Sequence, residues 1–286
     1  MSLNDNQFKK IPRSIRKIKQ LKTLSLEKNP IKRIPAFIKR MDSLKELNLS
    51  GTNIKLTKRA VKRLSRIETL ILASNKFENL PENIGKLQGV RKLNLAKNNL
   101  SELPASFGHL SELEHIIFYQ NEFKEFPKEI LALKKLQEID FYYNQLSSLP
   151  PGIGNFPVLK QLFLSYNQLT ILPDTLRNLN ELTYLFAHNN KLSVFPEWIG
   201  KHQKLQRIGL SKNSIINLPD LSGMSSLTDL DVQNNLIDRV PWELLEKEGM
   251  KLLLIRNNNY LLSEKDRDDL KNISTSLEAK GFFISY

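Results

Sequence analysis

Apolar residues return along this chain with a regular period of 23 residues, shortened once to 22. With the first apolar residue of each period taken as position one, positions four and six are also apolar, and position nine is almost always Asn. Position one is occupied in turn by Leu21, Leu44, Ile67, Val90, Leu113, Leu136, Leu159, Leu182, Leu205, Leu227 and Met250. Because positions four and six alternate with polar neighbours, each repeat predicts one short β-strand with a buried face.

The Asn residues at position nine predict a structural ladder. They come where the chain leaves the strand, and an amide side chain can both donate to and accept from backbone groups of neighbouring turns. The ladder we predict consists of Asn29, Asn75, Asn98, Asn121, Asn144, Asn167, Asn190, Asn213, Asn235 and Asn258. The second repeat has Thr52 in this place.

The second half of each repeat predicts a short outer segment. Most repeats continue to Leu-Pro, and proline favours extended backbone there. The second repeat lacks this proline, and its residues 56–66 read LTKRAVKRLSR, with Leu56, Ala60, Val61 and Leu64 at helical spacing. We therefore expect a helix in place of the extended segment.

The two ends of the repeat array differ. A half repeat precedes Leu21, and we predict a solenoid of this half repeat and eleven repeats over residues 1–262. Residues 263–286 predict a cap in the same domain: a capping box at 263–266, a helix with Leu270, Ile273 and Leu277 facing inward, and a last strand. At the other end, Leu3, Phe8, Ile11, Ile15 and Ile18 have no cap. This end predicts either a removed preceding segment or end-to-end self-association.

The consensus LxxLxLxxNxLxxLP resembles that of the leucine-rich repeat proteins, in the 23-residue form found in bacterial pathogens, notably spirochaetes. Intracellular Ras-regulating leucine-rich repeat proteins also use this form. The resemblance covers about residues 1–262. It implies an α/β fold: a right-handed, horseshoe-shaped solenoid with a parallel sheet on its concave face and short 3-10 or extended segments on its convex face.

Positions three, five, seven and eight are expected to project from the concave face, free of the packing constraint. The early repeats have small or polar residues there, whereas the fifth to eighth repeats have mostly aromatic ones. The partner-binding band that we predict consists of His115, Ile117, Tyr119, Tyr142, Tyr143, Phe163, Tyr166, Tyr184, Phe186 and His188. Tyr and Phe are typical interface anchors. The alternative is that these rings only pack on one another and stiffen the sheet.

The positive charge of the chain is concentrated in its first quarter. Residues 1–66 contain 19 Lys and Arg against 4 Asp and Glu, whereas the remainder contains 24 against 26. The basic patch that we predict consists of Lys32, Arg33, Lys39, Arg40, Lys58, Arg59, Lys62, Arg63 and Arg66. Such a patch attracts glycosaminoglycan, nucleic acid or anionic lipid. No aromatic residues alternate with these charges to stack bases. The alternative is a solvated face that aids solubility.

The sequence contains no recognisable catalytic motif. It has no cysteine, which excludes disulfides, thiolate zinc sites and a cysteine nucleophile. Nucleotide-binding, metalloprotease and serine-hydrolase motifs are missing, and its four histidines do not form a metal-ligand set. We therefore predict a protein that is not an enzyme and uses no metal or cofactor.

Together these features predict a protein-protein interaction module that binds its partner on the concave face, as a bacterial secreted or surface protein that engages host molecules. An intracellular signalling scaffold and a polyanion-binding protein are the alternatives. No apolar run approaches the roughly 20 residues of a transmembrane helix, and the N-terminus has no apolar signal-peptide core. A cytosolic protein and a secreted protein whose leader was removed both fit.

Overall fold

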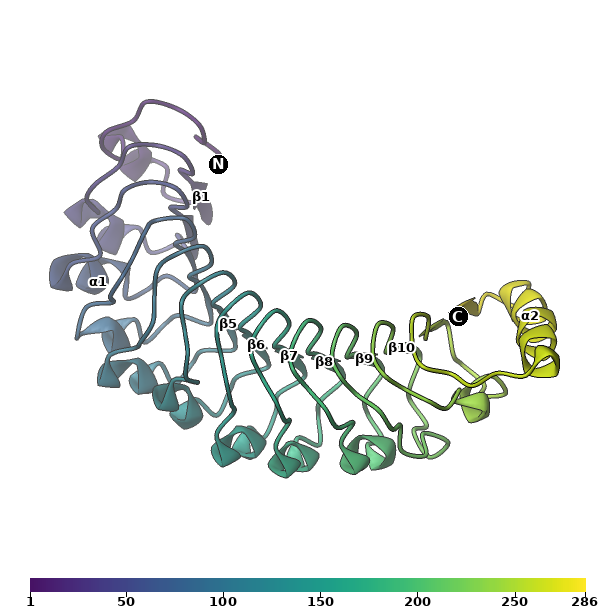
Figure 1. The fold of residues 1–286 in the computed structure, drawn as a ribbon. Coiled ribbons are helices and arrows are strands. Elements are labelled where there is room, and N and C mark those ends of the chain that lie inside the picture. Colours follow the sequence, from purple (N-terminus) through teal and green to yellow (C-terminus); the bar gives the residue numbers. More distant parts are fainter. The chain divides into compact units, whose positions relative to one another are not determined.

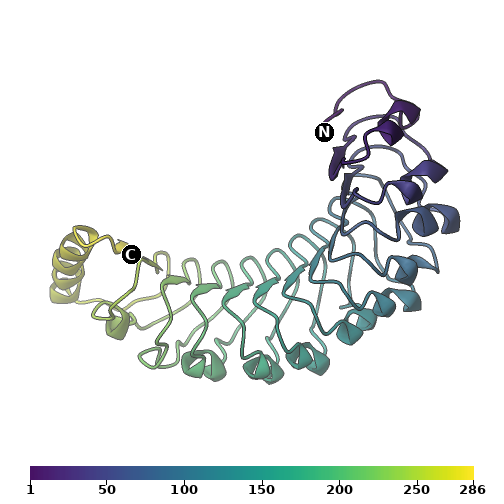
Figure 2. The same ribbon diagram turned by 180° about the vertical axis from the view of Figure 1, so that it is seen from behind.

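The computed structural model describes residues 1–286, which form two compact units, residues 1–144 and residues 145–286. Each repeat contributes a three-residue strand to a parallel sheet and then an outer segment, as the ribbons show from both sides (Figure 1 and Figure 2). The leucine-rich repeat solenoid predicted from the sequence is confirmed.

The first unit contains six strands in chain order. They are β1 (Thr23–Ser25), β2 (Glu46–Asn48), β3 (Thr69–Ile71), β4 (Lys92–Asn94), β5 (His115–Ile117) and β6 (Glu138–Asp140). Equivalent positions pair in each step, as Leu24 does with Leu47. The outer segments contain the 3-10 turns η1 (Arg13–Lys17), η2 (Ala36–Arg40), η3 (Ile84–Lys86), η4 (Ala105–His109) and η5 (Lys128–Ala132), and the helix α1 (Lys58–Leu64).

The second unit repeats this arrangement. Its strands are β7 (Gln161–Phe163), β8 (Tyr184–Phe186), β9 (Arg207–Gly209), β10 (Asp229–Asp231), β11 (Leu252–Leu254) and β12 (Phe283–Ser285). Its turns are η6 (Pro151–Asn155), η7 (Asp174–Asn178), η8 (Glu197–Lys201) and η9 (Trp242–Leu244), and α2 (Glu264–Glu278) precedes β12. The shortened ninth repeat has no helical turn between β9 and β10.

The predicted alternation in the strands is confirmed by their burial. The central residue of every strand is buried, and its two neighbours are in most strands half-exposed. In the first unit, the core includes a cluster of phenylalanines in which Phe118 contacts Phe107, Phe123 and Phe141 at ring-centroid distances of 6.0, 4.9 and 5.1 Å. One face of each strand therefore belongs to the core, and the other is left to interact with solvent or partners.

Position eight of every repeat has left-handed backbone, a conformation that the repeat consensus does not predict. The residues concerned are Asp5, Lys28, Gly51, Ser74, Lys97, Gln120, Tyr143, Tyr166, Asn189, Lys212, Asn234 and Asn257. This conformation directs their backbone N–H groups towards the next repeat, as when Gln120 donates to the Tyr142 carbonyl at 2.8 Å. The sheet ladder thus continues beyond the strands, although only one of these positions is glycine.

The Asn side chains at position nine lie between adjacent turns. Asn121 Nδ2 donates to the carbonyls of Phe118 in its own repeat and Leu95 in the preceding repeat, at 3.1 and 3.0 Å. Asn121 Oδ1 accepts from the backbone N–H of Leu100 at 3.0 Å. Each amide therefore satisfies buried main-chain groups of two repeats at once. Thr52 Oγ1 bonds to the Leu49 carbonyl of its own repeat at 2.8 Å and to Asn75 Oδ1 of the next repeat at 3.2 Å.

The predicted helix in the second repeat is confirmed. Helix α1 begins after Thr57, whose hydroxyl accepts from the Ala60 N–H, and it buries Ala60, Val61 and Leu64. Thr57 and Lys58 stand where most repeats have Leu-Pro, so this segment gains a side-chain cap and a helix instead of an extended segment.

The C-terminal capping box is confirmed. Ser263 accepts from the Asp266 N–H, and the Asp266 carboxylate accepts from Ser263 in return. Of the predicted inward stripe, Leu270 is fully buried, whereas Ile273 and Leu277 are half-buried. After α2, strand β12 pairs with β11 in parallel. The helix and strand follow the last repeat at the yellow end of the ribbon (Figure 1).

Of the five apolar residues of the half repeat for which we predicted no cap, Ile11 and Ile15 are buried. The half repeat folds onto β1, where the Leu3 N–H donates to the Ser25 carbonyl at 2.9 Å, and turn η1 directs Ile15 inward. Leu3 and Phe8 are half-buried, and Ile18 alone of the five predicted residues is exposed.

Replacing Asn121 with Ala should lower the free energy of unfolding by about 2–3 kcal/mol, because the buried Leu100 N–H loses its acceptor and two donor bonds disappear. Asn99→Ala is the matched control, since its side chain is exposed and bonds only to Glu122. It should change stability by less than about 0.5 kcal/mol. Urea unfolding followed by circular dichroism measures both, and equal effects would contradict the ladder's role.

Candidate functional site

Three tyrosines from neighbouring repeats form a cluster on the outward face of the first unit's sheet. The rings of Tyr119 and Tyr142 stack at 5.5 Å, and Tyr143 meets them edge-on at 6.0 and 4.8 Å. Lys97 Nζ lies 5.9 Å from the centre of the Tyr119 ring. Tyr143 is 41% exposed and the other two rings are half-buried. This tyrosine cluster offers apolar faces and hydroxyl groups in a fixed arrangement.

The other two predicted band residues of this unit lie beside the cluster, on β5. His115 Nδ1 is 2.9 Å from the Glu138 carboxylate, and Ile117 is half-buried. The rings therefore cover part of one another, and the exposed surface is smaller than five separate side chains would give.

An acidic residue absent from the predicted site lies in the same place. Asp140 is at position five of β6, and its Oδ1 accepts from the Tyr142 N–H at 2.8 Å. Burial raises the pKa of this carboxyl group to about 6, with a smaller contribution from Glu138, whereas the Tyr142 bond lowers it.

A second aromatic cluster lies on the outward face of the second unit's sheet. Phe186 stacks on Phe163 at 5.6 Å and on His188 at 5.7 Å, and Tyr184 lies 6.4 Å away. The Arg207 guanidinium lies 5.7 Å from the centre of the Tyr184 ring. We call this group the Phe186 cluster. Tyr166, also predicted for the band, is half-buried at position eight of its repeat.

His188 is held in this cluster by neighbouring repeats. The Ser211 backbone N–H donates to His188 Nδ1 at 3.3 Å, the Ser211 hydroxyl is 2.7 Å from the same atom, and the Asp231 carboxylate lies 3.6 Å away. Burial lowers the pKa of His188, although Asp231 opposes this effect. Because Ser211 and Asp231 both approach Nδ1, the three residues do not form a catalytic triad, which requires contacts to both ring nitrogens.

Gly209 makes room for two rings of the Phe186 cluster. A Cβ atom at this position would meet the His188 ring at 2.1 Å and the Phe186 ring at 2.6 Å. A small residue at position five beside an aromatic position five is the sequence signal that could have identified it.

The predicted basic patch lies on the outer side of the first unit. Lys32 and Arg33 precede η2, Lys39 and Arg40 lie in it, and α1 contains Lys58, Arg59, Lys62 and Arg63. Arg66 forms an ion pair with Asp42, so its charge is compensated. The sheet face and the basic patch are thus on different sides of the same repeats.

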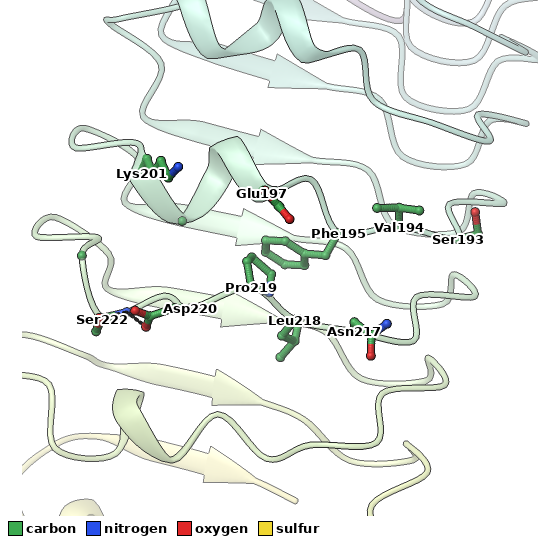
Figure 3. A pocket seen from close by; sticks show the side chains of 12 residues that line it. Ser193, Val194, Phe195, Glu197, Lys201, Asn217, Leu218, Pro219, Asp220 and Ser222 are labelled. Carbon is green, nitrogen blue, oxygen red and sulfur yellow. Dashed lines mark hydrogen bonds between the residues drawn. The ribbon is translucent and has the colours of Figure 1, made fainter.

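The remaining polar candidates show no catalytic arrangement. His202 is buried and its Nε2 donates to the Leu179 carbonyl at 3.0 Å, whereas His109 is exposed. No three His, Asp or Glu side chains are placed to hold a metal ion. A pocket of about 610 Å³ in the second unit has Glu197 and Lys201 on one side and Asp220 on the other (Figure 3). It lies where the shortened ninth repeat lacks a helical turn.

Comparisons with known proteins agree with this geometry. Two family models match the chain, "leucine-rich repeat region" over residues 53–148 and "leucine rich repeat" over residues 134–192. No curated protein sequence matches it. The chain is a leucine-rich repeat protein. Domains of this family typically serve protein-protein interaction and are generally non-catalytic.

Several solved structures are similar in fold. The plant peptide hormone receptor RGFR1, solved in complex with RGF2, is 26% identical, with a TM-score of 0.68 over 87% of this chain. The match spans 42% of the receptor chain. An internalin of Listeria monocytogenes is 18% identical with a TM-score of 0.76, covering 99% of this chain and 85% of its own. A leucine-rich repeat protein of Leptospira interrogans is 21% identical with a TM-score of 0.53, covering 100% and 95%.

These likenesses fit the resemblance noted from the 23-residue repeat. Neither α-helix combines the length and the apolar composition that a membrane span requires.

Asp140→Asn should raise stability at pH 7.5 by about 1–3 kcal/mol, because folding raises the pKa of this carboxyl group from 3.8 to about 6. The folded protein binds the proton more tightly, so wild-type stability falls relative to the variant as pH rises from about 4 to about 6. Urea unfolding at pH 4 and 7.5 measures the difference, which should nearly vanish at pH 4. A difference independent of pH would contradict the assigned burial of the charge.

Proposed function

We propose that this chain is a non-enzymatic protein-interaction module whose partner contacts the outward face of the sheet. The contact residues in the first unit are the tyrosine cluster with His115 and Ile117, and those in the second unit are the Phe186 cluster with Tyr166. Each cluster is proposed as a contact surface in its own right.

The observation that carries this proposal is the backbone at position eight. Tyr143 and Tyr166 occupy left-handed conformations, with φ values of 55° and 56°. A side chain with a Cβ is disfavoured there by about 1–2 kcal/mol, and Asn or Gly tolerates the conformation better. Asn and Gly occupy this position in other repeats, so a tyrosine is not required for the fold. Large aromatic residues retained at a strained position support a role in recognition.

The packing of the rings also favours binding. Stacked and edge-on contacts hold the side chains in one arrangement before a partner arrives, which reduces the entropy lost on association. If the rings only stiffen the sheet, removing one should lower the free energy of unfolding. If they serve binding, stability should be unchanged or higher.

The similarity to RGFR1 in complex with RGF2 supports a protein or peptide ligand for this chain as well. A secreted or surface protein that engages host molecules is the context we propose, on the basis of the repeat type. An intracellular signalling scaffold is the alternative context. Self-association through the N-terminal half repeat would involve the exposed Ile18.

Tyr143→Asn should leave stability unchanged or raise it by up to about 1 kcal/mol, because asparagine relieves the left-handed backbone. The same change should weaken partner binding at least about tenfold, as the loss of an aromatic anchor does. Gln120→Asn is the matched control, since Gln120 has the same position and φ in the preceding repeat. It relieves the same backbone conformation, so it should change stability to a similar extent but leave partner binding unchanged. Thermal unfolding measures the first effect, and a clear loss of stability would favour the stiffening role.

Binding is measured by passing host-cell extract and extracellular-matrix protein over the immobilised chain, then titrating the purified ligand with each variant. Phe163→Ser/Tyr184→Ser is the corresponding variant of the second unit. A ligand that stays bound to the immobilised wild type at high salt, and is not retained by either variant, supports the proposal. Retention insensitive to both variants but abolished by salt would contradict it and assign binding to the basic patch.

A further inference from the structure

A groove of about 960 Å³ lies on the outer side of the first unit, between the outer segments of the half repeat and the first repeat. Its lining is half cationic and half apolar. The cations are Lys9, Lys10, Arg13, Lys32, Arg33 and Arg63. The apolar residues are Ile11, Pro12, Pro30, Ile34, Pro35 and Phe37. We call this the basic groove; no acidic side chain lines it.

The charges of the basic groove are uncompensated. None of its six cations forms an ion pair, whereas elsewhere a cation commonly pairs with a carboxylate one repeat away, as Lys45 does with Glu68 and Lys204 with Glu181. Arg63 extends from α1 and donates to the Ile34 carbonyl, which holds its guanidinium at the groove wall. Six like charges in one concavity are mutually repulsive and create a strong field for an anionic ligand.

The cationic surface continues beyond the groove. An adjoining pocket of about 620 Å³ shares Arg33, Ile34 and Arg63 with it and adds Lys55, Lys58 and Arg59 around the start of α1. This pocket likewise has no acidic residue in its lining. The two concavities together form a path for an extended ligand across successive outer segments.

The apolar half of the lining identifies the kind of anion. Phe37 and the three prolines are only half-buried, so an occupant that covers them gains hydrophobic free energy. A sulfated glycan would satisfy the cations but has no apolar side chains for this surface. Nucleic acid would need stacking platforms, and Phe8 and Phe37 are the only aromatic residues in positions 1–66. An acidic peptide with apolar side chains satisfies both halves.

We propose that the basic groove binds an extended acidic peptide segment of a partner protein, with its carboxylates on the six cations and its apolar side chains against Phe37 and the prolines. The guanidinium groups of Arg13, Arg33 and Arg63 can each donate two hydrogen bonds to one carboxylate. This surface is distinct from the tyrosine cluster and does not depend on the function proposed for it.

The test measures fluorescence anisotropy of a labelled twelve-residue peptide in which Glu alternates with Leu, titrated with the full chain. A second peptide replaces every Leu with Ser and keeps the charge. We expect the Glu/Leu peptide to bind at least about tenfold more tightly than the Glu/Ser peptide, because only the first covers the apolar lining. Phe37→Ser should bring the two peptides close together in affinity.

Charge-reversed pairs locate the binding surface. Lys32→Glu/Arg33→Glu changes two cations in the groove, whereas Lys39→Glu/Arg40→Glu changes two exposed cations of η2 outside both concavities. The first variant should weaken the Glu/Leu peptide at least about tenfold and the second less than about threefold. Both variants change net charge equally, and circular dichroism confirms that each is folded.

Three outcomes would overturn the proposal. Equal losses of affinity for the Glu/Leu peptide in the two charge-reversed variants would show that only the overall electrostatic field attracts the peptide. Equal affinities of the Glu/Leu and Glu/Ser peptides for the wild type would remove the apolar half of the argument. The third outcome is displacement of the labelled peptide by a heparin fragment or an oligothymidylate. If either competitor acts at a lower concentration of negative charge than the unlabelled Glu/Leu peptide does, the groove binds polyanions in general.

Discussion

The architecture depends on the hydrogen bonds that the buried Asn side-chain amides at position nine form with the main chain. Where the chain leaves a strand and turns into the core, its main-chain carbonyl and N–H groups are buried away from water and need partners within the protein. One Asn side chain satisfies three such groups in two repeats, as Asn121 does. Since each repeat relies on its neighbour for these bonds and for its apolar packing, the repeats stabilise one another and the outward side chains contribute little to either.

Because the inward side chains stabilise the fold and the outward ones contribute little to it, the outward positions are free to vary for recognition. The inward positions of each strand are apolar without exception, but positions three and five vary from Thr and Ser in β1 to Tyr and Phe in β8. Position eight is different, because its side chain points outward while its backbone is constrained. A residue other than glycine bears a conformational cost there, which is why Tyr143 and Tyr166 have more weight in the proposed function than rings elsewhere on the sheet.

Much of the fold could be predicted from the sequence because its determinants are local and periodic. The strands, the outer 3-10 turns, helix α1 and the capping box at Ser263 each follow from residue types at fixed spacings. The left-handed position eight could not be read in this way, since Lys, Ser, Gln and Tyr occupy it as readily as Asn or Gly. It is imposed by the ladder of neighbouring repeats, a tertiary constraint that overrides local preference.

The candidate sites were less predictable, because they depend on contacts between repeats. The raised pKa of Asp140 arises from its burial, and the space at Gly209 is occupied by the His188 and Phe186 rings of the preceding repeat. Likewise, the charge excess of residues 1–66 was evident, but the apolar half of the basic groove was not. Ile11 and Ile34 are buried in the core, whereas the prolines that follow them, Pro12 and Pro35, present a second, half-buried apolar surface outside.

The two surfaces of the first unit differ in the physical interactions that they offer. On the sheet face, the ionisable side chains near the rings are largely paired or buried: His115 contacts Glu138, and the buried Asp140 accepts from the Tyr142 N–H. In the contact that we propose there, burial of apolar area would supply most of the binding free energy, which would change little with salt. On the outer side, six unpaired cations attract ligands over distances comparable with the Debye length of about 10 Å at 0.1 M salt. A partner with an acidic segment would thus be oriented by the outer side, where the association rate depends most on charge.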